Sequence, residues 1–423
     1  MSRFLYSVLQ YLLLPLVLAQ KLWRSRLAPA YRRRLGERFG FVVQPPAGRY
    51  LWIHAVSVGE ALAAAPLIER LLVAYPDFRV AVTTTTPTGS ERVRALFGQR
   101  VYHCYAPYDL PGSVRRFLGR VRPQLLVIME TELWPNLLHQ CAEANIPVVL
   151  ANARLSERSA RGYGRVPSLT KAMLLRLQTV AAQTSEDGQR FVALGLPMER
   201  LVVTGSIKWD VEITEVLRQT AAGLSVAWRS DARPVLLAAS THPGEEAMLL
   251  DALVALRRTY ADLLLVLVPR HPERFQAVVE MAGKRDLMVA RRSDPATLTD
   301  KTEVLVGDTM GELFTMMGAA RIVFVGGSLV DHGGHNVLEA AAWGVPVLTG
   351  PHFFNFQRVT EMLQIAGALQ VVDSGEQLPL AVGDILADEH RYQRMADSGS
   401  AVIKANRGAL DRLECLIGDQ IVR

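Results

Sequence analysis

Acidic residues that could move protons follow two apolar runs of the sequence. Glu60 comes shortly after the run Tyr50–His54, and Glu130 comes directly after a later run. A carboxylate at the end of a buried strand is suited to accept a proton from an attacking hydroxyl group. Ser57 and Glu60 also have the S-x-x-E spacing of a capping box, and this spacing alone favours the cap for Glu60. The alternative for Glu130 is an acidic turn before a helix over residues 136–144.

Polar residues that could bind a ligand follow other apolar runs. Lys208 lies in the segment GSIKWD after the run Leu201–Val203, and Arg270 follows a run of the second half. Cations at strand ends suit a phosphate or carboxylate, and an arginine fork can bind two oxygens at once. Glu312 follows the run Glu303–Val306 and could accept from ribose hydroxyls or a base amine. The sequence leaves open whether Lys208 is only a surface charge and whether Glu312 only begins a helix.

A glycine-rich segment could hold an anion. The apolar run Ile322–Val325 breaks into Gly-Gly-Ser, a second glycine pair (Gly333 and Gly334) follows, and Asn336 precedes a helix-forming run, Val337–Trp343. Glycine lets backbone N–H groups approach a ligand closely, and a helix N-terminus attracts negative charge. The spacing matches neither the dinucleotide-binding motif nor the P-loop, so tight corners alone explain it about equally well.

Metal ligands are not indicated. His332 and His335 are three residues apart, but no cysteine or acidic set completes a site, so we interpret both as polar turn residues. The three cysteines, Cys104, Cys141 and Cys415, lie far apart, which argues against a disulfide framework and suits a reducing compartment.

Strands and helices alternate along most of the chain, and near-continuous apolar strands predict parallel sheets covered by helices on both faces. A chain of 423 residues is long for one core, so we expect two domains. The fold class is therefore α/β, with two doubly wound Rossmann-like domains whose strand ends face a shared cleft. The predicted domains are 24–211 and 212–423. The predicted strands are 50–54, 79–83, 125–129, 148–150, 179–182, 201–203, 234–239, 263–268, 303–306, 321–325, 345–348 and 369–372.

The first 23 residues are predicted to form a membrane anchor. Phe4–Ala19 is nearly all apolar but slightly short of the about 20 residues that span a bilayer, so the segment could span or lie partly in the interface. Only Arg3 precedes it, whereas seven basic residues follow between Lys21 and Arg38. By the positive-inside rule this holds the following domain in the cytoplasm. A signal peptide is the competing interpretation, although Leu18-Ala19-Gln20 is a poor cleavage site.

Composition favours a globular protein with anionic partners. Half of the residues (50%) are hydrophobic, 21% are charged and the net charge is +6. The basic residues do not interleave with aromatic ones, and we find no nucleic-acid-binding signature, so no nucleic acid is expected as a partner.

Seven segments, in this order, resemble the 3-deoxy-D-manno-octulosonic acid (Kdo) transferases of lipopolysaccharide assembly. They are WIHAVSVGE (52–60), METELWPN (129–136), NARLSERS (152–159), GSIKWD (205–210), PRHPER (269–274), DTMGEL (308–313) and GGHNVLEAAAWGVPVLTGP (333–351). The resemblance implies a GT-B glycosyltransferase anchored on the cytoplasmic face of the inner membrane. Such an enzyme transfers Kdo from CMP-Kdo to an anionic lipid A precursor, lipid IVA, with inversion.

The resemblance also implies roles for residues. Glu60 would be the proton acceptor, and Glu130 and Lys208 would support the transition state. The residues implied to hold CMP are Pro269, Arg270, Met310, Gly311, Glu312, Asn336, Val337, Leu338 and Glu339. We expect no cofactor and no metal, because a nucleoside monophosphate donor lacks the diphosphate that often requires one. Two other functions stay open: a GT-B transferase or epimerase that uses a UDP-sugar, and a membrane-tethered module that only binds a nucleotide or lipid.

Overall fold

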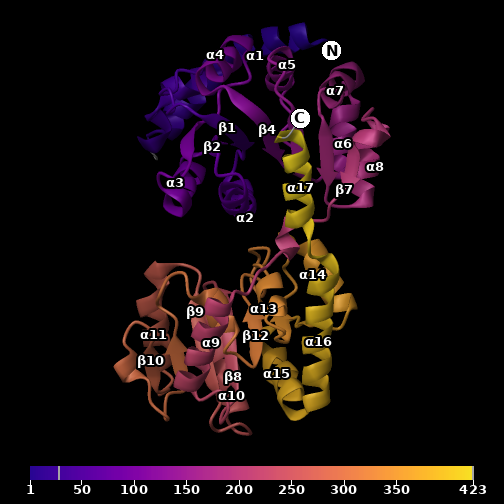
Figure 1. Ribbon diagram of the computed structural model, residues 1–423. Coiled ribbons are helices and arrows are strands. Elements are labelled where there is room, and N and C mark those ends of the chain that lie inside the picture. Colours follow the sequence, from indigo (N-terminus) through magenta and orange to yellow (C-terminus); the bar gives the residue numbers. More distant parts are fainter. Residues whose placement is uncertain (27–28, 422–423) are drawn as a thin grey trace. The chain divides into compact units, whose positions relative to one another are not determined.

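The computed structural model describes residues 1–26 and 29–421 and divides the chain into two compact units (Figure 1). The first unit contains Met1–Asp210 and the last helix, Ala409–Ile421 (α17), and the second contains Val211–Asn406. The change of unit after Asp210 lies one residue from the predicted boundary. The assignment of the chain end to the second domain was wrong, because the apolar side of α17 completes a core of the first unit.

The first unit is built on seven parallel strands in the order β3-β2-β1-β4-β5-β6-β7. The chain adds strands on one side of β1 and then on the other, as a doubly wound sheet does. The strands are β1 (Arg49–His54), β2 (Phe78–Thr84), β3 (Tyr102–Tyr105), β4 (Pro123–Met129), β5 (Val148–Ala153), β6 (Thr179–Ala182) and β7 (Leu201–Val203). The helices that connect and cover them are α2 (Val58–Ala74), α3 (Pro87–Phe97), α4 (Pro111–Val121), α5 (Pro135–Glu143), α6 (Glu157–Gly164), α7 (Pro167–Leu174) and α8 (Ser185–Ala193).

The second unit repeats this plan with the order β10-β11-β9-β8-β12-β13-β14. Its strands are β8 (Val235–Thr241), β9 (Leu264–Pro269), β10 (Val289–Arg291), β11 (Val304–Val306), β12 (Ile322–Val325), β13 (Val347–Thr349) and β14 (Leu369–Val371). Its helices are α9 (Glu215–Trp228), α10 (Glu245–Leu256), α11 (Phe275–Gly283), α12 (Leu313–Met317), α13 (Leu338–Ala342), α14 (Gln357–Ile365), α15 (Leu378–Ala387) and α16 (Glu389–Asn406). The predicted α/β class with two doubly wound sheets is confirmed.

The first helix, α1 (Arg3–Arg24), lies along the first unit. Near its start, the Ser7 hydroxyl and the Arg3 guanidinium donate to Asn136 Oδ1 at 2.9 and 3.2 Å. Near its end, the Lys21 ammonium lies 5.1 Å from the centre of the Tyr108 ring. Among the described residues α1 is the one helix that is long and apolar enough to cross a membrane, by length and composition only.

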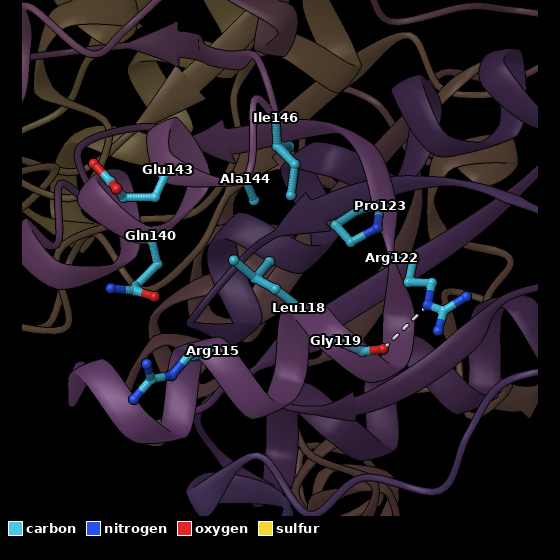
Figure 2. Close-up of a pocket in the computed structure, with 9 residues that line it drawn as sticks. All are labelled: Arg115, Leu118, Gly119, Arg122, Pro123, Gln140, Glu143, Ala144 and Ile146. Atoms are coloured by element: carbon cyan, nitrogen blue, oxygen red, sulfur yellow. Dashed lines mark hydrogen bonds between the residues drawn. The ribbon is translucent and has the colours of Figure 1, made fainter.

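A hollow of about 450 Å³ lies between α4 and α5 (Figure 2). It reaches Pro123, the first residue of β4, and so lies at the amino edge of the first sheet. The hollow therefore lies at the opposite end of β4 from Glu130, and it is not the candidate site.

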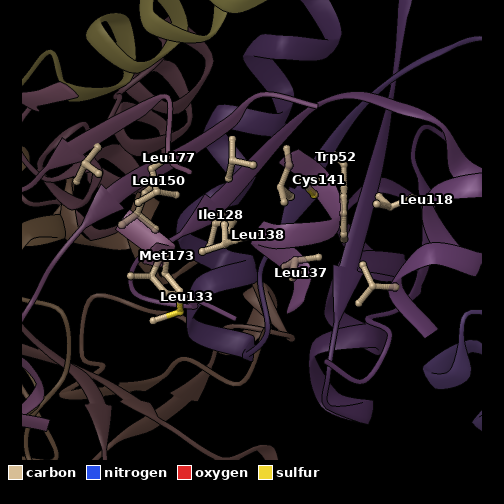
Figure 3. Close-up of a cluster of buried hydrophobic side chains, with 14 of the residues drawn as sticks. Trp52, Leu118, Ile128, Leu133, Leu137, Leu138, Cys141, Leu150, Met173 and Leu177 are labelled. Atoms are coloured by element: carbon tan, nitrogen blue, oxygen red, sulfur yellow. The ribbon is translucent and has the colours of Figure 1, made fainter. Parts of the chain in front are cut away.

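A core of buried side chains on one face of the first sheet holds β1 and β4 together (Figure 3). Trp52 of β1 and Ile128 of β4 are fully buried there, and the Trp52 indole N–H donates to the Thr83 hydroxyl of β2 at 2.9 Å. Burial of such large side chains is worth about 1.5–3 kcal/mol each. The carboxyl ends of these strands are thereby fixed.

Candidate active site

Glu60 stands in the first turn of α2, which begins just after β1 ends. The Ser57 hydroxyl accepts the Glu60 N–H at 3.1 Å and donates to Glu60 Oε1 at 2.9 Å. The other carboxylate oxygen, Oε2, accepts the N–H of Val56 at 2.8 Å. The cap suggested by the S-x-x-E spacing is therefore formed, and both carboxylate oxygens of Glu60 are held in place.

The same carboxyl group has an unusual proton affinity. Burial raises the pKa of Glu60 to about 7, and the nearby carboxylates of Glu132 and Glu130 add to the rise, against the hydrogen bonds from Val56 and Ser57. A base with a pKa near the working pH is the most effective one for general base catalysis. The cap explains the position of Glu60 and burial explains its pKa, so the two interpretations are compatible.

Glu130 follows β4 in a left-handed backbone conformation, with φ of 57°. Its N–H donates to the Ala151 carbonyl of β5 at 3.0 Å, and its carboxylate lies 3.7 Å from the Arg154 guanidinium. A residue other than glycine costs of order 1 kcal/mol in such a conformation, and such residues collect at functional sites. This turn, not a regular helix start, sets the direction of the Glu130 side chain.

Glu132 belongs to the same edge, although the sequence analysis gave it no role. Its Oε2 accepts the indole N–H of Trp134 at 2.9 Å. Burial raises the pKa of Glu132, and the Glu130 carboxylate raises it further. The signal in the sequence was the pair of glutamates in METELWPN, because residues two positions apart lie on the same face of an extended chain.

Lys208 stands in a short helical turn after β7, Ile207–Trp209 (η4). Ile207 and Trp209 are buried while Lys208 is exposed, and none of the described residues pairs with its ammonium group. The buried Asn152, which lies near the end of β5 with φ of 52°, accepts the Ile207 N–H at 3.2 Å through its side-chain oxygen. Asn152 therefore fixes the turn that presents Lys208.

The glycine-rich turn of the second unit is occupied from within the protein. The fully buried Glu245 accepts the N–H groups of Gly327 (2.7 Å), Ser328 (2.9 Å) and Leu329 (2.9 Å), and also that of His242 (2.9 Å). The expectation that these N–H groups are free for a ligand anion was therefore wrong for this half of the segment. A carboxylate from α10 already satisfies them.

The second half of that segment contains a short helix, and two of its polar side chains bond to each other. The predicted helix Val337–Trp343 is the five-residue α13, and Val337 and Leu338 are buried. The Asn336 amide donates to Glu339 Oε1 at 3.0 Å, and burial raises the pKa of Glu339. Side chains at 337 and 338 are thus committed to the core, which leaves their backbone as the part that can meet a ligand.

The other residues implied to hold CMP follow neighbouring strands of the second sheet. Arg270 follows Pro269, the last residue of β9, and is exposed. Met310 and Gly311 form an exposed turn after β11, and Gly311 has φ of 87°. Glu312 is not free, because its carboxylate accepts from Arg292 at 2.9 Å.

Within residues 1–26 and 29–421, no group of three or more His, Cys, Asp or Glu side chains is placed to hold a metal ion.

Comparison with known proteins points to the family that the sequence segments resemble. Residues 33–211 match the family model described as 3-deoxy-D-manno-octulosonic-acid transferase (kdotransferase), and residues 237–402 match glycosyl transferases group 1. The chain is 45% identical to the 3-deoxy-D-manno-octulosonic acid transferase of Haemophilus influenzae over 100% of both chains. It is 38% identical to that of Bordetella pertussis over 92% of each. The crystal structure of UDP-GlcNAc 2-epimerase from Neisseria meningitidis bound to UDP-GlcNAc has a TM-score of 0.57 at 15% identity, over 88% of this chain and 99% of that one.

The two doubly wound parallel sheets, with a buried carboxylate at the carboxyl edge of the first and arginine at that of the second, define a GT-B glycosyltransferase. The epimerase shares only this fold. The chain belongs to the Kdo transferase family, which confirms the resemblance found in the sequence.

Proposed function

We propose that the protein transfers Kdo from CMP-Kdo to a hydroxyl group of a lipid A precursor, lipid IVA, with inversion at the anomeric carbon. The acceptor oxygen forms a bond to that carbon while its proton passes to Glu60, and the bond from the carbon to a phosphate oxygen of CMP breaks. The observation that carries the proposal is Glu60: a buried, immobilised carboxylate whose pKa is about 7.

The charges that develop during this reaction fit the other proposed residues. The sugar carbon becomes partly cationic and the departing phosphate gains negative charge. We propose that Glu130 stabilises the positive charge on the carbon. We propose that Lys208 stabilises the negative charge on the phosphate, because Lys208 is exposed and unpaired among the described residues.

The donor is proposed to lie at the carboxyl edge of the second sheet. The exposed guanidinium of Arg270 suits the phosphate, and Pro269, Met310, Gly311 and Glu312 line the same edge. Asn336 and Glu339 offer polar side chains, whereas Val337 and Leu338 are buried and offer backbone groups.

We propose that α1 attaches the protein to the membrane by lying in the membrane–water interface. Both ends of α1 contact the first unit, while Phe4, Leu12, Leu16 and Trp23 are between 63% and 76% exposed. A helix that packs along its domain and exposes an apolar side suits the boundary between headgroups and acyl chains. The exposed basic residues after α1, Arg26, Arg32 and Arg33, then face anionic lipids on the cytoplasmic side of the inner membrane.

Product analysis tests the function. Purified protein is incubated with the lipid A precursor and either CMP-Kdo or a UDP-sugar, and the products are weighed by mass spectrometry. We expect a product heavier by whole Kdo units with CMP-Kdo alone. Turnover with a UDP-sugar and none with CMP-Kdo would refute the donor assignment.

A further inference from the structure

Four histidines gather at the carboxyl edge of the second sheet. β8 is the first strand of this unit, and the chain places β9 on one side of it and β12 on the other. At such a reversal of strand order the loops diverge, and open α/β sheets bind their ligands there. His242 follows β8, His271 follows β9, and His332 and His335 follow β12.

His242 is the centre of this histidine cluster. Its Nε2 lies 2.9 Å from Nε2 of His335. Its ring stacks on that of His332 with 4.2 Å between the ring centres, and it meets the His271 ring edge-on at 5.5 Å. The two turn histidines noted in the sequence therefore belong to a larger group, which two further strands complete.

The contact between His242 and His335 has room for only one proton between the two Nε2 atoms. Two imidazole nitrogens can share a hydrogen bond only when one bears a proton and the other does not. Protonation of the accepting Nε2 would set two N–H groups against each other and break the bond. Both N–H groups would then be available to an acceptor such as a phosphate oxygen.

The surroundings keep the pair neutral without a ligand. Burial lowers the pKa of His242, with His332, His271 and Arg270 lowering it further and Glu245 opposing them. Burial lowers the pKa of His335 to about 4, and His242, Arg270, His332 and His271 add to this shift. An anion beside these groups would reverse the balance, because an opposite charge favours the protonated imidazole.

We propose that the histidine cluster is a proton-linked site for the phosphate of a nucleoside monophosphate. As the phosphate binds, one proton from solvent moves onto the accepting Nε2 of the His242–His335 pair, their mutual bond opens, and both Nε2–H groups donate to phosphate oxygens. This inference rests on the proposed function, because it assumes that the donor nucleotide binds the second unit. A protonated imidazole at this place also stabilises the charge of the departing nucleotide.

Calorimetric titration of the full-length protein with CMP measures the linked proton. Titrations at pH 7 in two buffers of different ionisation enthalpy give the number of protons taken up. We expect about one proton per CMP for the wild type, and an affinity that rises by up to about tenfold per pH unit lowered. His335→Gln should lose at least half of this uptake. His390→Gln, an exposed histidine of α16, is the matched control and should behave as the wild type.

CMP has a phosphate pKa of about 6 of its own, but this contribution is the same for every variant, so the difference between variants counts. Cytidine, which lacks the phosphate, should bind without proton uptake. If His335→Gln unfolds below the titration temperature, the exposed His332→Gln replaces it, with a smaller loss expected in the same direction.

Equal proton uptake in His335→Gln and wild type, or equal uptake with cytidine and CMP, would overturn the proton-linked site while the donor assignment stood. A wild type that binds no CMP at any pH would overturn both.

Discussion

Glu60 is both the cap of α2 and the proposed base, two roles that the sequence presented as alternatives. Its carboxylate caps α2 through Val56 and Ser57, and the same bonds prevent it from turning away from a substrate. Burial and the two neighbouring glutamates then keep its proton affinity far above that of an ordinary carboxylate. A capping glutamate exposed to solvent would have neither the fixed carboxylate nor the raised proton affinity.

The exchange of Glu60 for glutamine tests its role as the base. Glutamine keeps the size and one acceptor oxygen, so the fold and CMP binding should persist, while the transfer rate should fall by about 10²–10⁴-fold. Steady-state transfer and CMP titration measure the two quantities. Glu91→Gln, an exposed glutamate of α3, is the control. A normal transfer rate in Glu60→Gln would remove Glu60 from the chemistry.

The pKa of Glu60 predicts the acid side of the pH profile. The base must be deprotonated, so kcat/KM should fall as the pH drops below about 7 and level off above it. Glu132→Gln removes a like charge while keeping an acceptor for the Trp134 indole, so the fall should move to lower pH. Initial rates between pH 5 and 9 in both proteins check this. An unmoved profile would show that another group controls it.

At the level of elements, α17 is held to the first unit by polar side-chain contacts as well as by its apolar side. The Asp210 carboxylate accepts the N–H groups of Gly408 and Leu410 at 2.6 and 2.7 Å, so it caps the start of α17. α17 packs against α2, the helix that carries Glu60. α17 thus supports the helix that carries the proposed proton acceptor.

Loss of this cap should loosen α17. Asp210→Ala is expected to lower the free energy of unfolding by about 1–2 kcal/mol. Hydrogen exchange should show faster exchange of the amides of α17, and denaturant unfolding gives the energy. Glu212→Ala, an exposed acidic residue two positions away, serves for comparison. Equal stability of the two variants would show that the Asp210 cap does not contribute to holding α17.

At the level of the whole molecule, α1 supplies an apolar surface that no other described part of the chain matches in length. Leu12→Glu with Leu16→Glu should weaken binding to vesicles of anionic lipid at least about a hundredfold, because each exposed leucine contributes roughly 1.5–3 kcal/mol when buried. Flotation with vesicles measures this. Transfer to a detergent-dispersed acceptor should continue.

The comparison variant carries Val216→Glu and Val226→Glu, two exposed valines of α9. It should float with vesicles as the wild type does. Retained flotation of the leucine variant would place membrane binding elsewhere.

The sequence predicted the strands that are both apolar and regular, and with them the α/β class. It missed β3 and β10, because YHCY and VAR are short and carry polar residues. It placed Glu60 and Arg270 at strand ends correctly. It could not predict that Glu245 fills the glycine-rich turn, since that contact joins residues 82 positions apart. Nor could spacing reveal the left-handed turn at Glu130, which depends on its bond to β5.

The return of α17 to the first unit has a consequence for synthesis. At about 5–20 residues per second, the ribosome needs on the order of 10–40 s to pass from Asp210 to the start of α17. Throughout that time the apolar side of α2 in the nascent first unit is uncovered. Ala409, Leu413 and Ile417 of α17 cover it later. Chaperones that bind exposed apolar segments therefore have a defined interval in which to hold this protein, and a prematurely terminated chain keeps that surface open.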